Sequence, residues 1–155
     1  MTREVGQPAP PFTLRDRDRQ KVTLESYPDK HLVVAFYPLA FTGGCESEMT
    51  AFRTHTDAFT RANAQVLGVS VDSFASAGKF QEELGLEFPL LSDFPKNRAG
   101  REYGVYNEDF GVADRVTFVI DKDRVIRAVH AESADFESHP IAALEALKEL
   151  GENPD

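Results

Sequence analysis

The sequence predicts one α/β domain around a mixed β-sheet, and three observations support this prediction. Short apolar runs alternate with stretches whose apolar residues recur at helical spacing, as in chains that alternate strands and helices. Two late apolar runs are separated only by a four-residue polar turn, which adds an antiparallel edge to the sheet. The length of 155 residues suffices for one sizeable core but not for two. We therefore expect a single domain over residues 1–155, with helices on both faces of the sheet.

The first half of the chain predicts a small hairpin, two buried strands and one long helix. Phe12–Leu14 and Val22–Leu24 alternate in polarity around a polar run, which is typical of a hairpin. The continuous apolar runs at 32–37 and 66–71 predict strands that are buried on both faces. One amphipathic helix ending near Asn63 is predicted by a stripe of residues spaced three and four apart, namely Cys45, Met49, Phe52, Thr56 and Phe59.

The second half continues the alternation. Asp72 and Ser73 are candidates to cap a helix over residues 74–84. The next predicted elements are a short strand at Phe88–Leu91, a short helix at Ala99–Tyr103, strands at Val116–Ile120 and Val125–Val129, and a last helix marked by Ile141, Leu144, Leu147 and Leu150. We expect the final residues, Gly151–Asp155, to be a frayed tail.

Charge and composition exclude several classes of partner. The net charge of −9 disfavours a nucleic acid or an anionic membrane as partner, because phosphate binding needs clustered Lys and Arg. The first residues lead into prolines rather than an apolar run, and no stretch is long and apolar enough for a signal peptide or a membrane span. We therefore expect a cytoplasmic protein.

The chain contains a single cysteine, Cys45, so no internal disulfide can form. A lone intracellular cysteine is commonly a small buried apolar residue. Its surroundings here favour a reactive role, because it lies where a predicted central strand has ended and a helix begins. The positive end of the helix dipole and unpaired backbone N–H groups favour a thiolate at that position. Gly43 and Gly44 would let a small ligand approach the backbone closely, although two adjacent glycines are also typical of a plain turn.

The residues around Cys45 resemble the peroxiredoxin active-site motif. The pattern is Pro38-x-x-x-Thr42-x-x-Cys45-x-x-Glu48, preceded by Phe36-Tyr37. Arg115 stands just before a predicted strand, where this family places its catalytic arginine. The chain is most similar to the alkyl hydroperoxide reductase E branch, and the resemblance implies a thioredoxin-like fold.

The resemblance also implies a role for each motif residue. Cys45 would attack the peroxide, the Thr42 hydroxyl and the Cys45 N–H would contact it, and Pro38 would shield the site from water. Arg115 would hold the thiolate and the peroxide oxygens. Glu48, one helical turn after Cys45, is a candidate to orient Arg115 by a charge-assisted hydrogen bond, although a solvated helix carboxylate is the alternative. Gly44 has a supporting role.

Ionisation alone cannot explain a fast peroxidase. An ordinary thiol of pKa about 8.5 is only about 3% ionised at pH 7, so full ionisation gains roughly thirty-fold, about 2 kcal/mol. The larger contribution must come from donors directed at the charge that develops as the O–O bond breaks. Arg115, Thr42 and backbone N–H groups are the candidates.

The lone cysteine also predicts the type of mechanism. Some peroxiredoxins carry a resolving cysteine five residues after the first, and that position here is Thr50. The oxidised Cys45 must therefore be reduced by an external thiol, which we expect to be a low-molecular-weight thiol or a thioredoxin-like or glutaredoxin-like protein. A thioredoxin-type oxidoreductase is the first alternative, but the C-x-x-C pair that it requires is absent. A redox sensor with the same site chemistry remains open as the second.

No cofactor or metal is expected. The four histidines, His31, His55, His130 and His139, show no ligand spacing with one another or with Cys45, which favours exposed or capping roles. Phe41, Tyr106 and Phe110 lie in loops that flank the site in related proteins, where they predict a homodimer interface; alternatively, Phe41 and Phe110 form an apolar rim for larger peroxides.

Overall fold

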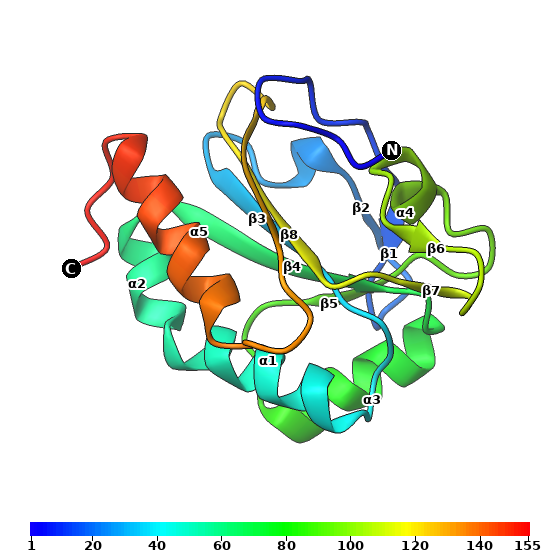
Figure 1. Cartoon of the computed structure of the whole chain (residues 1–155). Helices are drawn as coiled ribbons and strands as arrows, with labels where there is room; N and C mark the ends of the chain where they lie inside the picture. Colours follow the sequence, from blue (N-terminus) through cyan, green and yellow to red (C-terminus); the bar gives the residue numbers. More distant parts are fainter.

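The computed structural model describes residues 1–155, and its main sheet has seven strands in the order β2-β1-β5-β4-β3-β8-β9 (Figure 1). β3 pairs in parallel with β4, and β4 with β5, whereas β8 pairs antiparallel with both β3 and β9. The predicted mixed sheet is confirmed. Its strands are β1 (Leu14–Arg15), β2 (Lys21–Val22), β3 (His31–Phe36), β4 (Ala64–Ser70), β5 (Leu90–Ser92), β8 (Val116–Ile120) and β9 (Ile126–Ala131).

The helices cover the two faces of this sheet unequally. Val33 and Ala35 of β3 face the core cluster to which α1, α2, α3 and α5 contribute, whereas Leu32 and Val34 face the other cluster. On that second side lie the short α4, one 3₁₀ turn at Leu24–Ser26, the N-terminal segment and residues 105 and 113 from the segment after α4. The prediction of helices on both faces is therefore confirmed, but the second face carries only one short α-helix, α4. The helices are α1 (Gly43–Thr54), α2 (Thr56–Arg61), α3 (Phe74–Leu84), α4 (Arg98–Glu102) and α5 (Ser138–Glu149).

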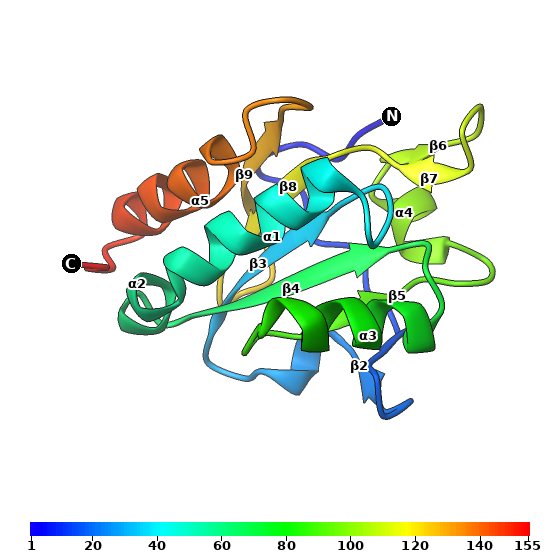
Figure 2. The ribbon, with the colours of Figure 1, turned by 90° about the horizontal axis from the view of Figure 1, so that it is seen from below.

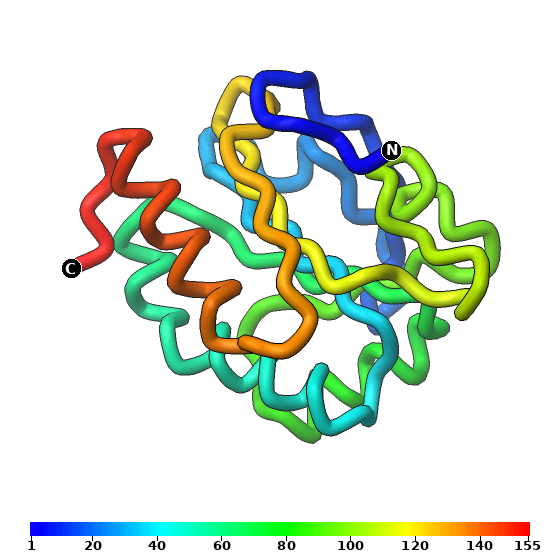
Figure 3. The backbone as a smooth tube through the Cα atoms, in the orientation of Figure 1, coloured from blue at the N-terminus to red at the C-terminus, as the bar shows by residue number.

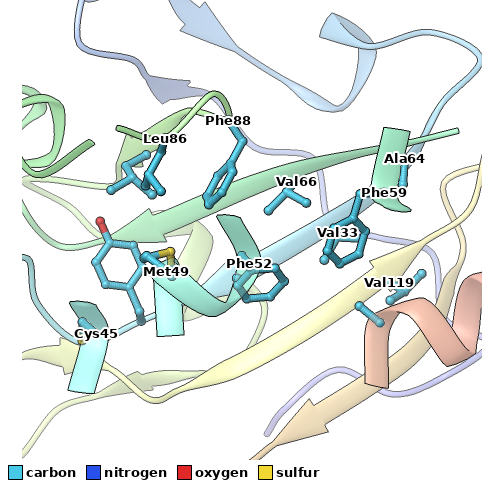
Figure 4. Packing of buried hydrophobic residues seen from close by; sticks show 14 of the residues in the cluster. Val33, Cys45, Met49, Phe52, Phe59, Ala64, Val66, Leu86, Phe88 and Val119 are labelled. Carbon is cyan, nitrogen blue, oxygen red and sulfur yellow. The ribbon is translucent and has the colours of Figure 1, made fainter. Parts of the chain in front are cut away.

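The core beneath α1 fixes the helix that carries the cysteine. Met49 and Phe52 are fully buried and gather with Val66 and Phe88 between the helix and the sheet (Figure 4). Fully burying one side chain of this size contributes about 2 kcal/mol to stability. The predicted apolar stripe of α1 therefore anchors the start of the helix against the sheet.

The single helix predicted over residues 45–63 is wrong in one respect, because it breaks at His55. This residue has φ −102° and ψ 14°, which lies outside the helical region, and α2 begins at the next residue. The Thr54 and Thr56 hydroxyls donate to the carbonyls of Thr50 and Arg53, and such side-chain bonds commonly bend or end helices. Phe59 nevertheless reaches the same core as Phe52, so the apolar spacing survives the break.

Two further elements differ from expectation. The N-terminal hairpin is shorter than predicted and belongs to the main sheet, where Arg15 of β1 pairs with Ser92 of β5. A separate small antiparallel ribbon, made of β6 (Tyr106–Asn107) and β7 (Val112–Ala113), forms where a loop was predicted. Two residues, Asp114 and Arg115, connect it to β8, so the ribbon helps to place Arg115.

The prediction that Gly151–Asp155 form a frayed tail is wrong. Glu152 Oε2 lies 2.7 Å from His31 Nε2, and the Pro154 carbonyl accepts a 2.7 Å hydrogen bond from Arg61. Pro154 itself is buried.

The two ends of the chain lie far apart on the molecule (Figures 1 and 2). None of the helices combines the length and the apolar character that crossing a bilayer would require.

Candidate active site

Cys45 lies in the first turn of α1, directly after the central strand β3 and a six-residue connection. It is the third residue of the helix, and only 1% of its surface is exposed. Parallel strands β3 and β4 both end at this edge, which is where open α/β sheets place their ligands. The predicted strand-to-helix position of Cys45 is therefore confirmed.

The start of α1 leaves donors free beside the sulfur. Thr42 occupies the N-cap position with extended backbone, but its hydroxyl donates to the Leu39 carbonyl at 2.9 Å and does not cap the helix. The backbone N–H groups of Gly43, Gly44 and Cys45 consequently have no acceptor in the structure. Free N–H groups at a helix start, together with the helix dipole, favour negative charge at this position.

The loop before α1 is fixed from the neighbouring strand. The Asp72 carboxylate accepts a 2.8 Å bond from the Ala40 N–H and a 2.6 Å bond from the Ser70 hydroxyl. Phe41 adopts φ +64°, an unfavourable region for an aromatic residue, and its ring packs 5.2 Å from that of Phe80. Asp72 is thus a loop anchor, while Ser73 alone caps α3 through a bond from the Ser76 N–H.

Arg115 brings the two ends of the predicted motif together. Its Nη1 lies 3.6 Å from Cys45 Sγ and donates a 2.6 Å hydrogen bond to Glu48 Oε1. Its guanidinium carbon lies 4.8 Å from the centre of the Phe136 ring, within the range of a cation–π contact. Burial lowers the pKa of Arg115, but the charges of Glu48 and Cys45 outweigh it and the pKa lies above its usual value. Arg115 is therefore a fixed cation against the sulfur.

Glu48 is completely buried, contrary to the alternative of a solvated carboxylate. Burial raises its pKa to about 7, although the charge and hydrogen bond of Arg115 act in the opposite direction. Its second oxygen, Oε2, has no donor and lies 3.9 Å from His139 Nδ1. Glu48 thus lies between the arginine at the sulfur and a histidine behind it.

The structure brings together Cys45, Gly44, Glu48 and Arg115, but it shows no contact of Thr42 or Pro38 with the sulfur. Thr42 is exposed and Pro38 is half-buried beside the loop anchor. Sequence reasoning missed Phe136, which lies in a polar loop without periodicity. It also assigned His139 an exposed or capping role, whereas this residue is fully buried. His31 is likewise buried, against Glu152.

No three His, Cys, Asp or Glu side chains lie close enough together to hold a metal ion.

Comparison with known proteins identifies relatives over most of the chain. The AhpC/TSA family matches residues 5–129. An alkyl hydroperoxide reductase E from Mycobacterium tuberculosis is 42% identical over 125 residues, covering 79% of this chain and 82% of the relative. A chloroplastic peroxiredoxin Q from Sedum lineare is 38% identical over 146 residues, covering 94% of this chain and 78% of the relative.

Solved structures agree in fold over nearly the whole chain. The peroxidoxin BcpB from Mycobacterium tuberculosis superposes with a TM-score of 0.90 at 30% identity, covering 95% of this chain and 97% of that one. A Xylella fastidiosa PrxQ C47S mutant gives a TM-score of 0.87 at 27% identity, covering 97% and 99%. The thioredoxin-like peroxiredoxin fold is therefore confirmed. Matched by family, by sequence relatives and by fold, the chain belongs to the AhpC/TSA family of peroxiredoxins, the thiol-dependent peroxidases.

Proposed function

We propose that Cys45 is the peroxidatic nucleophile of this one-cysteine, thiol-dependent peroxidase. Its thiolate attacks one peroxide oxygen, so that an S–O bond forms while the O–O bond breaks. The departing oxygen takes up a proton and leaves as an alcohol or water, and Cys45 becomes a sulfenic acid. The observation that carries this proposal is the 3.6 Å approach of Arg115 Nη1 to Cys45 Sγ, beside three unpaired N–H groups.

Arg115 and the Cys45 N–H stabilise the charge that develops on the two oxygens. Donors of this kind, fixed before the reaction starts, supply more of the rate than ionisation does. The Thr42 hydroxyl joins them once it turns from the Leu39 carbonyl toward the peroxide. Pro38 shields the site from water, and Gly44 supports it by leaving room for the Phe136 ring beside Arg115. Glu48 orients Arg115 through their 2.6 Å hydrogen bond.

Hydrogen peroxide and organic hydroperoxides are the proposed substrates, with peroxynitrite as a further candidate. Because the chain has no second cysteine, an external thiol must reduce the sulfenic acid. Its class is a low-molecular-weight thiol or a thioredoxin-like or glutaredoxin-like protein. The cytoplasm keeps thiols reduced and would supply this reductant, so a cytoplasmic location is part of the proposal. Fluorescence microscopy of the tagged chain tests this location.

Stopped-flow oxidation of the reduced protein by a panel of peroxides, with mass spectrometry of Cys45, tests the proposed activity. One equivalent of peroxide should yield a sulfenic acid that dimedone traps, and Cys45→Ser should abolish peroxide consumption. Turnover of Cys45→Ser above a few per cent of the parent rate would defeat the assignment. A single oxidation without turnover in the presence of thiols would favour the redox sensor instead.

We also propose that the chain forms a homodimer through the loops beside the site. Phe110 is 78% exposed and Phe41 is 51% exposed, and apolar side chains that protrude in this way are typical of interaction surfaces. Tyr106, in β6, lies at the base of the ribbon that carries Phe110. Sedimentation at micromolar concentration tests the assembly, and finding only the 17.2 kDa species would rule it out.

Residues 1–155 are proposed to unfold as one domain. The contacts of Glu152 with His31 and of Pro154 with Arg61 tie the end of the chain to its middle. A single calorimetric transition is expected, and two separate transitions would contradict it.

A further inference from the structure

The Glu48 carboxylate has a buried oxygen that nothing satisfies. Oε1 accepts the bond from Arg115, but Oε2 is inaccessible to solvent and has no hydrogen-bond donor. A buried acceptor without a donor costs about 1–3 kcal/mol. Another ionisable residue, His139, has its Nδ1 3.9 Å from Oε2.

The contacts of His139 define the tautomer of its neutral ring. Nε2 lies 2.7 Å from the Glu132 carbonyl oxygen, which can only accept, so Nε2 carries the hydrogen. Nδ1 then holds a lone pair and accepts from the Thr117 hydroxyl at 2.8 Å. In this state Nδ1 and Glu48 Oε2 are both acceptors and lie 3.9 Å apart in a buried space, too far for a direct hydrogen bond. One additional proton, on either atom, would remove the conflict.

The buried, unsatisfied Glu48 Oε2 favours one proton on this pair, against the positive charge of Arg115. Glu48 lies on α1 and Arg115 on the segment before β8; from β9, the His130 ring stands edge-on to His139 at 4.8 Å. The Glu132 carboxylate is held by the Ala134 and Asp135 N–H groups. Burial lowers the pKa of His139, which the Glu132 carbonyl opposes and the charges of His130 and Arg115 reinforce. Burial raises the pKa of Glu48 to about 7.

Arg115 is shared by two acids. The same nitrogen, Nη1, contacts Cys45 Sγ and Glu48 Oε1, so a fully charged Glu48 competes with the thiolate and the peroxide for one guanidinium charge. A proton placed on Oε2 removes that negative charge and leaves Oε1 free to accept the bond from Arg115. The orientation of Arg115 is then kept while its charge acts on the sulfur.

We propose that His139 is a positioning residue of the peroxidase site: its neutral ring, beside Glu48 Oε2, favours a proton on Glu48 and thereby controls how much of the Arg115 charge acts on Cys45. The thiol proton of Cys45 has a destination in this pair when the thiolate forms. After the S–O bond has formed and the O–O bond has broken, the departing alkoxide takes up one proton, so the cycle conserves protons. This inference rests on the proposed role of Cys45 and adds a residue that the motif does not contain.

The test compares pH profiles of peroxide consumption for the parent and for His139→Gln. A glutamine amide can donate to the Glu132 carbonyl and accept from Thr117, but it cannot take up a proton. We expect a parent rate that rises as the thiolate forms and falls at higher pH, where the pair loses its proton. In His139→Gln the falling limb should move down by about one pH unit, which corresponds to about a ten-fold loss in the proton affinity of Glu48.

His55→Gln is the matched control, because His55 also contacts a glutamate, at 3.1 Å, but lies at the end of α1 and is partly exposed. Its profile should follow that of the parent. A His139→Gln profile that is lowered equally at every pH, with the falling limb unmoved, would make His139 a merely structural residue and overturn the proposal.

A second measurement does not depend on activity. Nitrogen NMR of the His139 ring in the parent should show a titration whose midpoint Glu48→Gln displaces, and a midpoint that ignores Glu48→Gln would also overturn the proposal. If Cys45→Ser still consumed peroxide while the two residues titrated together, the proposed role of Cys45 would fail and the coupling of His139 to Glu48 would stand.

Discussion

The Phe136 ring occupies the space into which a side chain at Gly44 would project. A Cβ atom at residue 44 would lie 2.9 Å from Phe136 Cζ and 3.2 Å from Arg115 Nη2. The loop that carries Phe136, between β9 and α5, runs beside the start of α1 in the backbone trace (Figure 3). Glycine at 44 therefore allows the ring to lie over Arg115 and close the site.

Replacing this glycine should slow peroxide attack. Gly44→Ala must displace Phe136 or the guanidinium, so we expect the second-order rate constant to fall by about ten-fold or more, as small displacements of catalytic groups do. Gly43→Ala is the matched control, because nothing lies within 4 Å of a Cβ built at that position. Equal rates for the two variants would show that the contact with Phe136 has no bearing on the reaction.

Arg115→Ala should slow peroxide attack by at least about a hundred-fold, since loss of one such donor costs about 3 kcal/mol. The thiolate fraction, followed by ultraviolet absorbance, should account for only a small part of that loss. Arg127→Ala is a suitable control, because Arg127 is half-exposed and pairs with Asp121 in the β8–β9 region. A loss fully explained by the thiolate fraction would mean that Arg115 acts on ionisation and not on the transition state.

The strands and the cysteine were predictable because local signals determine them. A strand buried on both faces must be apolar throughout, and β3 is buried along its whole length. The change from this run to helical spacing at Cys45 indicates the start of α1 without any long-range information. The same helical spacing did not predict the break at His55, where two threonine hydroxyls bond to backbone carbonyls.

The partners behind Glu48 were not predictable, because they come from distant segments. His139 lies 91 positions after Glu48 in the sequence, and only the packing of α5 beside α1 brings the two residues together. The tail was misjudged for the same reason, since its Glu152 carboxylate and Pro154 carbonyl contact the distant His31 and Arg61. The last apolar stripe was partly wrong as well, because Ile141 is 47% exposed.

The buried Glu48 should make stability depend on pH. Its pKa in the folded protein is raised to about 7 from an ordinary value of 4.5, so the folded state binds the proton more tightly than the unfolded state. The stabilisation is then fully present below pH about 4.5 and is lost as the pH rises through about 7. Urea unfolding of the parent across this range, compared with Glu48→Gln, isolates the contribution of this carboxyl. A difference in unfolding free energy between the two proteins that stays constant with pH would contradict the prediction.

The lone cysteine should make the enzyme vulnerable to its own substrate. A sulfenic acid at Cys45 has no internal thiol to condense with, and a second peroxide carries it to sulfinic acid, which ordinary thiols do not reverse. We therefore expect progressive loss of activity when peroxide is in excess and reductant is scarce. A small thiol that is present beforehand should protect the protein by forming a mixed disulfide. Because Cys45 is almost fully buried under Phe136 and Arg115, a small thiol should reach it faster than a bulky protein does.

Intact mass after titration of the reduced protein with peroxide, with and without the small thiol, decides between these outcomes. Gain of two oxygens without thiol, and of one thiol adduct with it, is the expected pair of results. A sulfenic species that takes up no further oxygen at large peroxide excess would refute the vulnerability, and a disulfide-linked dimer would indicate resolution between subunits. Thr50→Cys should not rescue the parent unless α1 unwinds, because residues five apart on a helix do not face each other and a disulfide needs Cα atoms within about 7 Å. Protection by Thr50→Cys would therefore show that the first turns of α1 open after oxidation, which would also expose Cys45 to a protein reductant.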